Sequence, residues 1–114
     1  LDPDAVIVAT GGRPLMPEDV GGLDHPRVVT SDEVLRGEVD LGQNVAVIGG
    51  SSMGVETADF ILKDHGKRVV VVEMMHDVLL DVSHDAKLVL LDKLYKKPYR
   101  PVVDTRAARR HARL

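Results

Sequence analysis

The sequence predicts an incomplete α/β domain with a mainly parallel sheet and a three-layer arrangement of sheet and helices. Two observations carry this prediction. Short runs of consecutive aliphatic residues alternate with segments of helical spacing, which is typical of parallel sheets whose strands are linked by helices. A glycine-rich turn stands between one aliphatic run and the helical segment that follows it. With 114 residues, the chain has room for one domain.

The composition excludes several classes of site. Because the chain has no cysteine, it contains no disulfide, no thiolate nucleophile and no zinc or iron–sulfur site held by sulfur. Its five histidines have no spacing with acids that repeats a metal motif. No run of about 18 apolar residues occurs, and the first residues lack the features of a signal peptide. We therefore expect a cytoplasmic protein without a membrane partner.

Charge is distributed unevenly along the chain. Residues 1–92 carry 7 basic and 17 acidic side chains, whereas residues 93–114 carry 8 basic and 1 acidic side chain. Nucleic acid is not expected as the main partner of such an acidic body, because affinity for phosphates comes largely from lysine and arginine. Residues 98–114 are predicted to be a solvated, disordered basic tail, with a contact to nucleic acid or to the acidic body left open.

Three aliphatic runs are predicted as strands, at residues 5–9, 44–48 and 68–73. The first and third are apolar at successive positions, so we expect both of their faces to be buried. Between the first two runs lie several prolines and glycines and an acidic stretch. In that stretch, Ser31 is the expected N-cap of one helical turn.

Two longer helices are predicted. The first covers residues 55–63, and Gly54, Ala58 and Ile61 fall on the face that would pack against the sheet. The second covers residues 84–96, because Ser83 is a suitable N-cap and apolar residues with a spacing of three to four follow it. From Pro98 onward these patterns disappear, except for a short extended piece at residues 102–103.

Residues 44–73 form a strand, a glycine-rich turn, a helix and a second strand that ends in an acid. This is the layout of a dinucleotide-binding, Rossmann-like βαβ unit, whose helix N-terminus points free N–H groups at a pyrophosphate. In the fingerprint G-x-G-x-x-G, Gly49 and Gly54 are the first and third glycines, and Ser51 replaces the second. The Ser51 side chain either crowds the phosphate or donates a hydrogen bond to it. Similar turns also occur in folds that bind no nucleotide.

Glu73 is predicted to bind the adenine ribose. It lies 24 positions after Gly49, close to the offset of about 20 at which a carboxylate takes the ribose 2′-hydroxyl of NAD. Residues 74–78 contain no arginine or lysine to pair with a 2′-phosphate, and His76 is the one possible cation among them. The pattern therefore favours NAD(H) over NADP(H).

Two motifs in this order resemble one protein family. The segment DAVIVATGGRP at residues 4–14 and the βαβ unit, with GVETA at residues 54–58, resemble pyridine nucleotide-disulfide oxidoreductases, flavoproteins with two dinucleotide folds. Val72-Glu73-Met74 resembles the branch of 2,4-dienoyl-CoA reductase, enoate reductase and other Old yellow enzyme-like NADH:flavin oxidoreductases. The resemblance implies that residues 1–43 cross over from an otherwise missing FAD-binding domain, and that residues 44–97 are the NAD-binding domain.

The resemblance also implies roles for individual residues. In the family, the matching positions border the pyrophosphate, hold the adenine ribose, face the nicotinamide as Glu56 would here, or pass near FAD as Thr10 and Gly11 would here. No catalytic residue and no metal ligand is predicted. The implied cofactor-binding residues are Thr10, Gly11, Gly49, Gly50, Ser51, Ser52, Met53, Gly54, Glu56, Glu73 and Met74.

Two functions remain as hypotheses. The resemblance implies the NAD(P)H-binding portion of an FAD-dependent oxidoreductase, which positions NADH for hydride transfer to FAD. Since the FAD fingerprint, the cluster cysteines and the FMN barrel of that branch are absent, we expect a fragment that is incomplete for catalysis. Its expected partners are the nicotinamide dinucleotide and either the missing FAD-binding half or a second copy. The alternative is a non-catalytic interaction or regulatory protein that retains the scaffold.

Overall fold

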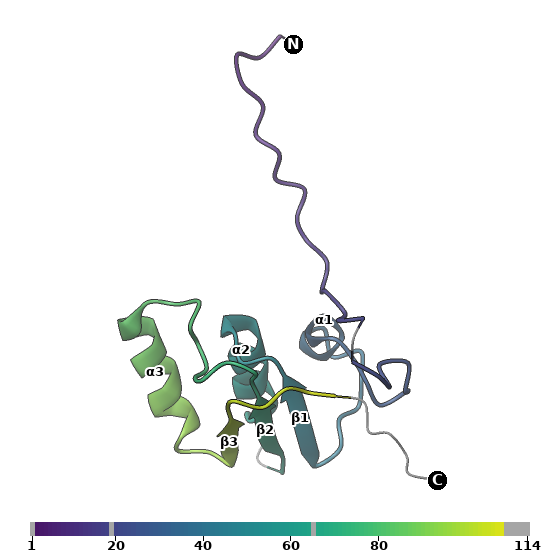
Figure 1. The fold of residues 1–114 in the computed structure, drawn as a ribbon, viewed down its shortest axis with the longest axis vertical. Helices are drawn as coiled ribbons and strands as arrows, with labels where there is room; N and C mark the ends of the chain where they lie inside the picture. The colour runs from purple at the N-terminus through teal and green to yellow at the C-terminus, as the bar shows by residue number, and fades with distance from the viewer. Residues whose placement is uncertain (1, 19, 65, 109–114) are drawn as a thin grey trace.

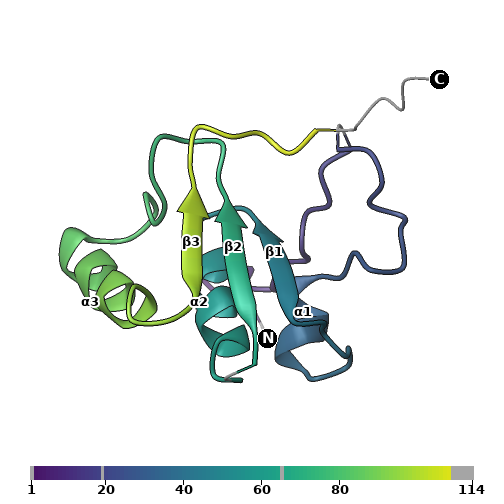
Figure 2. The same cartoon turned by 90° about the horizontal axis from the view of Figure 1, so that it is seen from below.

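The computed structural model describes residues 2–18, 20–64 and 66–108. The protein is built on a three-stranded parallel sheet in the order β1-β2-β3, with helices on one side of it (Figures 1 and 2). The predicted α/β, Rossmann-like fold with a parallel sheet is thereby confirmed. In chain order the elements are α1 (Ser31–Leu35), β1 (Asn44–Ile48), α2 (Ser52–Ile61), β2 (Arg68–Val72), α3 (His84–Leu94) and β3 (Tyr99–Val102).

The register of the sheet decides which loops meet. β1 pairs with β2 from Asn44 opposite Arg68 to Ile48 opposite Val72. Both strands therefore end at the same level, and the residues that follow them lie at one edge of the sheet. β3 joins the other side of β2, with Val102 opposite Val72. This register places the glycine-rich turn after β1 beside the acid that follows β2.

One face of the sheet carries the hydrophobic core. Val69 and Val71 of β2 are 1% and 0% exposed, and Val55 and Ala58 of α2 are both 0% exposed. Burying an aliphatic side chain of this size contributes about 1.5–3 kcal/mol relative to leaving it exposed. The prediction that β2 is buried on both faces is wrong for the other face, where Val70 is only half-buried.

The opposite face of the sheet is covered by none of the described helices. Figure 2 looks onto this face, with α1 and α2 behind the strands and α3 beside β3. Ile48, at the end of β1, is 56% exposed there. Of the three predicted layers, the described residues form two, because the helices lie on the same side of the sheet.

The first predicted strand does not form. Residues 5–9 belong to an extended segment that runs away from the sheet and has no neighbouring strand in the described part of the chain (Figure 1). Val6, Ile7 and Val8 are 75%, 91% and 79% exposed. The run is as apolar as a buried strand, but a strand also needs partners for its backbone N–H and C=O groups, and no described strand supplies them.

A strand forms instead where the sequence predicts only a short extended piece. β3 lies inside the segment predicted as a disordered tail, and it begins at Tyr99, three residues before the extended piece predicted at residues 102–103. Pro101 is tolerated because β3 is an edge strand, and one of its sides has no ladder to complete. After β3, Thr105 donates its backbone N–H to the Glu73 carbonyl at 2.9 Å. The end of the predicted tail, residues 109–114, lies outside the described residues.

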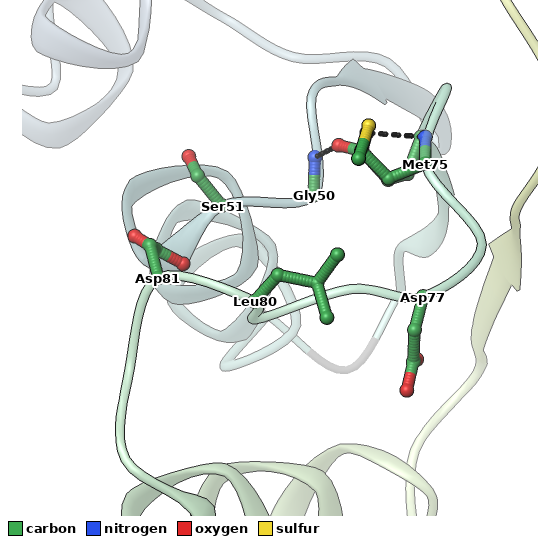
Figure 3. A pocket seen from close by; sticks show the side chains of 7 residues that line it. Gly50, Ser51, Met75, Asp77, Leu80 and Asp81 are labelled. Atoms are coloured by element: carbon green, nitrogen blue, oxygen red, sulfur yellow. Dashed lines mark hydrogen bonds between the residues drawn. The ribbon is translucent and has the colours of Figure 1, made fainter.

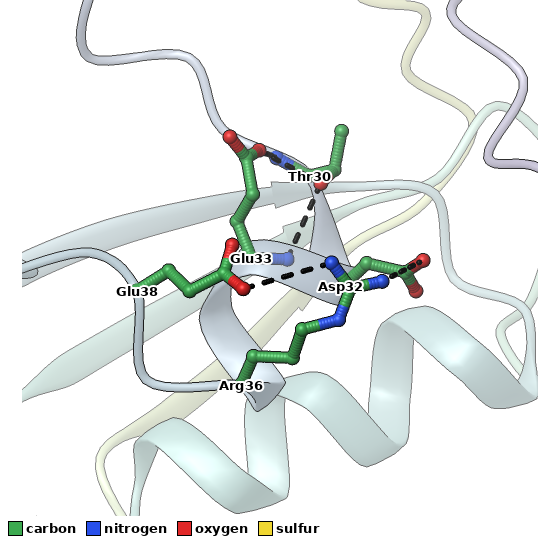
Figure 4. Close-up of polar contacts among 5 residues, drawn as sticks. All are labelled: Thr30, Asp32, Glu33, Arg36 and Glu38. Carbon is green, nitrogen blue, oxygen red and sulfur yellow. Dashed lines mark hydrogen bonds and ion pairs between the residues drawn. The ribbon is translucent and has the colours of Figure 1, made fainter.

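A capping box starts α1, and its N-cap is Thr30 rather than the predicted Ser31 (Figure 4). The Thr30 hydroxyl accepts a hydrogen bond from the Glu33 backbone N–H at 3.3 Å, and the Glu33 carboxylate accepts one from the Thr30 N–H at 2.7 Å. The backbone N–H of Thr30, followed by its hydroxyl, lowers the pKa of Glu33. Only Thr30 stands at the spacing from Glu33 that allows both bonds, which explains the shift of the cap.

The two longer helices follow the predicted spacing and differ at their ends. α2 begins at Ser52 rather than at residue 55 and ends at Ile61, with Leu62 as C-cap. α3 begins after Ser83 as predicted, and the Ser83 hydroxyl accepts a hydrogen bond from the Ala86 N–H at 3.4 Å. It ends at Leu94 rather than near residue 96. Local caps decide helix ends, and apolar spacing does not locate them.

Leu94→Ala is expected to lower the free energy of unfolding by about 2–5 kcal/mol, because truncation of a buried leucine leaves a cavity. Leu94 is 0% exposed and lies in the core. Leu88→Ala on the same helix is the matched control, since Leu88 is 54% exposed, and we expect it to cost about 0.5 kcal/mol. Urea denaturation followed by circular dichroism measures both variants. Equal losses would contradict the packing of α3 against the core.

Candidate functional site

The turn between β1 and α2, residues 49–51, brings the start of the helix against the end of the strand; we call it the glycine turn. Gly49 has a φ of +105°, which residues with side chains rarely adopt. A Cβ atom on Gly54 would lie 2.0 Å from the Gly49 carbonyl oxygen, closer than real contacts allow. A Cβ atom on Gly50 would lie 2.7 Å from Cγ1 of Val78. The missing side chains of Gly54 and Gly50 allow the close approach of the Gly49 carbonyl and of Val78, whereas Gly49 is required for its backbone conformation.

Glu73 follows β2 directly, and its carboxylate links the residues after the two strands. One oxygen accepts a hydrogen bond from the Gly50 N–H at 2.6 Å, and the other accepts one from the Met75 N–H at 2.7 Å. The acid predicted to bind ribose therefore lies beside the glycine turn. Each carboxylate oxygen has a second lone pair, so these bonds leave acceptors for a further donor.

The connection between β2 and α3, residues 73–83, folds over the glycine turn; we call it the β2–α3 loop. Leu79 donates its backbone N–H to the Gly50 carbonyl at 2.7 Å, while its side chain is 1% exposed. Its φ of 56° is uncommon for a bulky residue, and such a conformation costs about 1–3 kcal/mol. Burial of the side chain and the hydrogen bond offset this strain, so the loop is fixed to the turn.

Asp81 caps the N-terminus of α2, although no sequence motif identifies it. The Ser52 N–H lies 2.9 and 3.0 Å from the two Asp81 carboxylate oxygens, and the Ser52 hydroxyl donates to one of them at 2.6 Å. α2 has no acid in its own first turn, so Asp81 supplies the negative charge that a helix N-terminus favours. The Ser52 hydroxyl, followed by its N–H, holds the pKa of Asp81 below its ordinary value.

Ser51, the residue at the second glycine position of the fingerprint, is the N-cap of α2. Its side chain makes no capping hydrogen bond and is exposed. Figure 3 shows its hydroxyl on the outside of the turn. The Ser51 hydroxyl thus does not cap the helix. The Asp81 carboxylate accepts the hydrogen bond from the helix end instead.

The glycine turn and the β2–α3 loop border a shallow hollow of about 230 Å³ (Figure 3). Complete small-molecule sites commonly have about 300–1,000 Å³, so the hollow has room for part of a dinucleotide. Three of its lining residues are carboxylates. Asp77, one of them, accepts a hydrogen bond from the Lys87 amine at 2.5 Å, and this bond lowers the pKa of Asp77. The lining residues are Gly50, Ser51, Glu73, Met75, Asp77, Leu80 and Asp81.

Most of the predicted site residues meet at this edge of the sheet. Residues 49–54 and Glu73 are brought together by the parallel register and by the bonds just described. Met53 and Met74, which follow the two strand ends closely, are 49% and 64% exposed. Glu56 is exposed on α2, about one turn beyond its first residue.

Other predicted features lie apart from this site. Thr10 and Gly11 are exposed in the extended segment that runs away from the sheet, so the structure does not bring them to the glycine turn (Figure 1). Within the described ranges, no group of three or more His, Asp or Glu side chains could hold a metal ion. No helix in the same ranges has the length and apolar character needed to cross a membrane.

Comparison with known proteins identifies the family. A family model described as pyridine nucleotide-disulphide oxidoreductase matches residues 1–98. The chain belongs to this family. The match spans the extended segment of residues 4–14 and the whole βαβ unit, so both motifs noted in the sequence lie within it. The chain is therefore related to oxidoreductases.

Several oxidoreductases are similar in sequence over most of this chain. An NADH oxidase from Thermoanaerobacter brockii is 35% identical over 99 residues, which cover 84% of this chain and 15% of the relative. A dihydrolipoyl dehydrogenase from Bacillus subtilis (strain 168) is 38% identical over 99 residues, covering 82% of this chain and 20% of the relative. A solved structure of 2-naphthoyl-CoA reductase with 2-naphthoyl-CoA has a TM-score of 0.79 at 30% identity, covering 84% of this chain and 14% of that chain. The chain thus spans 20% or less of these relatives.

Gly54→Ala is expected to lower the free energy of unfolding by about 1–3 kcal/mol, as overpacking does. The added methyl group would meet the Gly49 carbonyl, which is backbone and cannot rotate away. Gly42→Ala is the matched control, because a Cβ atom there has no heavy atom within 4 Å. Urea denaturation measures the difference. A Gly54→Ala protein as stable as Gly42→Ala would contradict the close approach of α2 to the glycine turn.

Acid is expected to destabilise the protein partly through Asp77 and Asp81. Both carboxyl groups have a lowered pKa in the folded state. Their contribution to stability is therefore fully present above the unfolded value of about 3.9 and is lost as the pH falls through the folded values. The Asp77→Asn/Asp81→Asn double variant should show a shallower fall of Tm between about pH 5 and pH 2 than the unchanged protein. Parallel profiles in thermal unfolding would contradict this expectation.

Proposed function

We propose that this chain is the NAD(H)-binding portion of an FAD-dependent oxidoreductase, and that it positions NADH for hydride transfer to flavin. One observation carries the proposal. The N-terminus of α2, the glycine turn and the Glu73 carboxylate lie together at the carboxyl ends of β1 and β2. In open α/β sheets this is where dinucleotides bind, with the pyrophosphate at the helix N-terminus.

The glycine turn fits a pyrophosphate because it brings the N-terminus of α2 directly against the end of β1, where the ligand would lie. Gly49 and Gly54 hold α2 directly behind the strand end, so that the N–H groups of its first turn face outward from the sheet edge. The exposed Ser51 hydroxyl makes no capping bond, so it is able to donate to a phosphate oxygen. Of the two roles that the sequence leaves open for Ser51, we therefore propose the donor.

Glu73 supports NAD(H) over NADP(H) within this proposal. Its carboxylate is held beside Gly50 and keeps unused lone pairs, which suit the ribose 2′-hydroxyl as donor. A 2′-phosphate at the same place would meet three carboxylates, Glu73, Asp77 and Asp81. The nearest lysine in the described contacts, Lys87, is already paired with Asp77. Repulsion between these carboxylates and a 2′-phosphate disfavours NADP(H).

FAD binding is not assigned to residues of this structure. Thr10 and Gly11, which the family resemblance implicates, are exposed in an extended segment and do not line the hollow beside the glycine turn. When bound elsewhere in a complete family member, FAD would accept the hydride. We therefore propose that the chain binds and orients NADH but does not turn over by itself.

Similarity to a cinnamate reductase from Clostridium sporogenes, 40% identical over 76 residues, supports the assignment of this chain to the enoate reductase branch of the family.

A second candidate function is non-catalytic binding of a protein partner. The exposed apolar run of Val6, Ile7 and Val8 favours it, because extended apolar segments of this kind mark sites of association. The two candidates differ on one point. The first requires saturable nucleotide binding at the glycine turn, and the second does not.

Titration of the isotope-labelled chain with NADH and, separately, NADPH tests the first function. We expect saturable amide shifts at residues 49–54 and at Glu73, with tighter binding of NADH than of NADPH. Glu73→Ala should weaken NADH binding about tenfold or more, as the loss of a hydrogen bond to a charged group does. Glu18→Ala, which removes an exposed acid from a turn that follows the extended segment, is the matched control and should leave affinity unchanged. A well-dispersed spectrum that neither nucleotide changes would overturn the proposed function.

A further inference from the structure

The N-terminus of α2 already holds an anion that belongs to the protein. Both carboxylate oxygens of Asp81 face the Ser52 N–H, and one also accepts from the Ser52 hydroxyl. These are donors of the helix end at which the proposed function places the pyrophosphate. Asp81 also lines the hollow beside the glycine turn. A phosphate oxygen and the Asp81 carboxylate cannot occupy this position together.

We propose that Asp81 is a specificity-determining residue that competes with the pyrophosphate for the N-terminus of α2, so that nucleotide binding displaces its side chain. This inference rests on the proposed function and concerns the same site. In the absence of nucleotide, Asp81 satisfies the helix end. In its presence, the carboxylate leaves the Ser52 N–H and the phosphate takes its place.

The structure allows this exchange with the movement of one side chain. Asp81 is exposed, so its carboxylate has solvent into which to rotate. The loop that carries it is held independently, by the Leu79 N–H on the Gly50 carbonyl and by the Glu73 carboxylate on the Gly50 N–H. Departure of the Asp81 side chain therefore leaves the glycine turn and the ribose-binding acid in position.

The competition distinguishes charged from uncharged ligands, because Asp81 acts through its negative charge. A ligand with a pyrophosphate both displaces the carboxylate and experiences its repulsion, whereas an uncharged nucleoside does neither. Asp81 should therefore weaken the binding of ADP and NADH and leave adenosine unaffected. Its removal raises the affinity for phosphate-bearing ligands alone.

Calorimetric titration of the 114-residue chain with ADP, NADH and adenosine tests the inference. Asp81→Asn keeps an oxygen acceptor for the Ser52 N–H and removes the charge, and Asp81→Ala removes both. We expect both variants to bind ADP and NADH about tenfold more tightly than the unchanged chain, with no change for adenosine. Asp85→Asn removes the same charge from the first turn of α3, which makes no described hydrogen bond to α2, and should change affinity little.

The possible outcomes separate this inference from the proposed function. Unchanged or weaker ADP binding by Asp81→Asn, with NADH binding intact in the unchanged chain, would overturn the competition and leave the proposed function standing. An equal gain from Asp85→Asn would also overturn it, because general charge repulsion would then explain the effect. No binding of NADH or ADP by any variant would overturn both. A gain confined to the two Asp81 variants, and to ADP and NADH, supports the competition.

Discussion

The structure depends on the close approach of α2 to the turn that precedes it. Because the Gly54 backbone lies where a Cβ atom would be 2.0 Å from the Gly49 carbonyl oxygen, the helix begins almost directly after β1. This approach directs the helix N-terminus to the edge of the sheet and lays the apolar face of α2, with Val55 and Ala58, on the buried side of β2. Core packing and the position of the anion-binding end of the helix thus have the same cause.

A second layer of constraint comes from the β2–α3 loop. Glu73, Leu79 and Asp81 each bond to the glycine turn or to the residue after it. Two of these contacts use carboxylates, so the site is acidic and its donors are backbone N–H groups and serine hydroxyls. Under the proposed function, recognition of a phosphate there would depend on the helix end rather than on lysine or arginine, and the local carboxylates would oppose it. This balance makes the site sensitive to single charges.

The described residues also leave apolar surface uncovered. The extended segment with Val6, Ile7 and Val8 and the open face of the sheet with Ile48 are both accessible to solvent. The chain spans 20% or less of the length of the NADH oxidase, the dihydrolipoyl dehydrogenase and the 2-naphthoyl-CoA reductase described above. Uncovered apolar surface of this kind is a property through which protein parts associate.

The sequence by itself determined the βαβ unit, the start of α3 at Ser83 and the pairing of the glycine fingerprint with Glu73, because these follow from local apolar spacing, caps and turn geometry. It could not decide that residues 5–9 remain without a strand partner and that residues 99–102 form a strand. A strand exists only where another strand offers hydrogen bonds. Thr30, rather than the predicted Ser31, is the N-cap of α1 because of its hydrogen bonds with Glu33. The contact of Asp81 with Ser52 joins residues 29 positions apart. Only the tertiary structure creates it, because the β2–α3 loop must first fold over the turn before the carboxylate reaches the helix end.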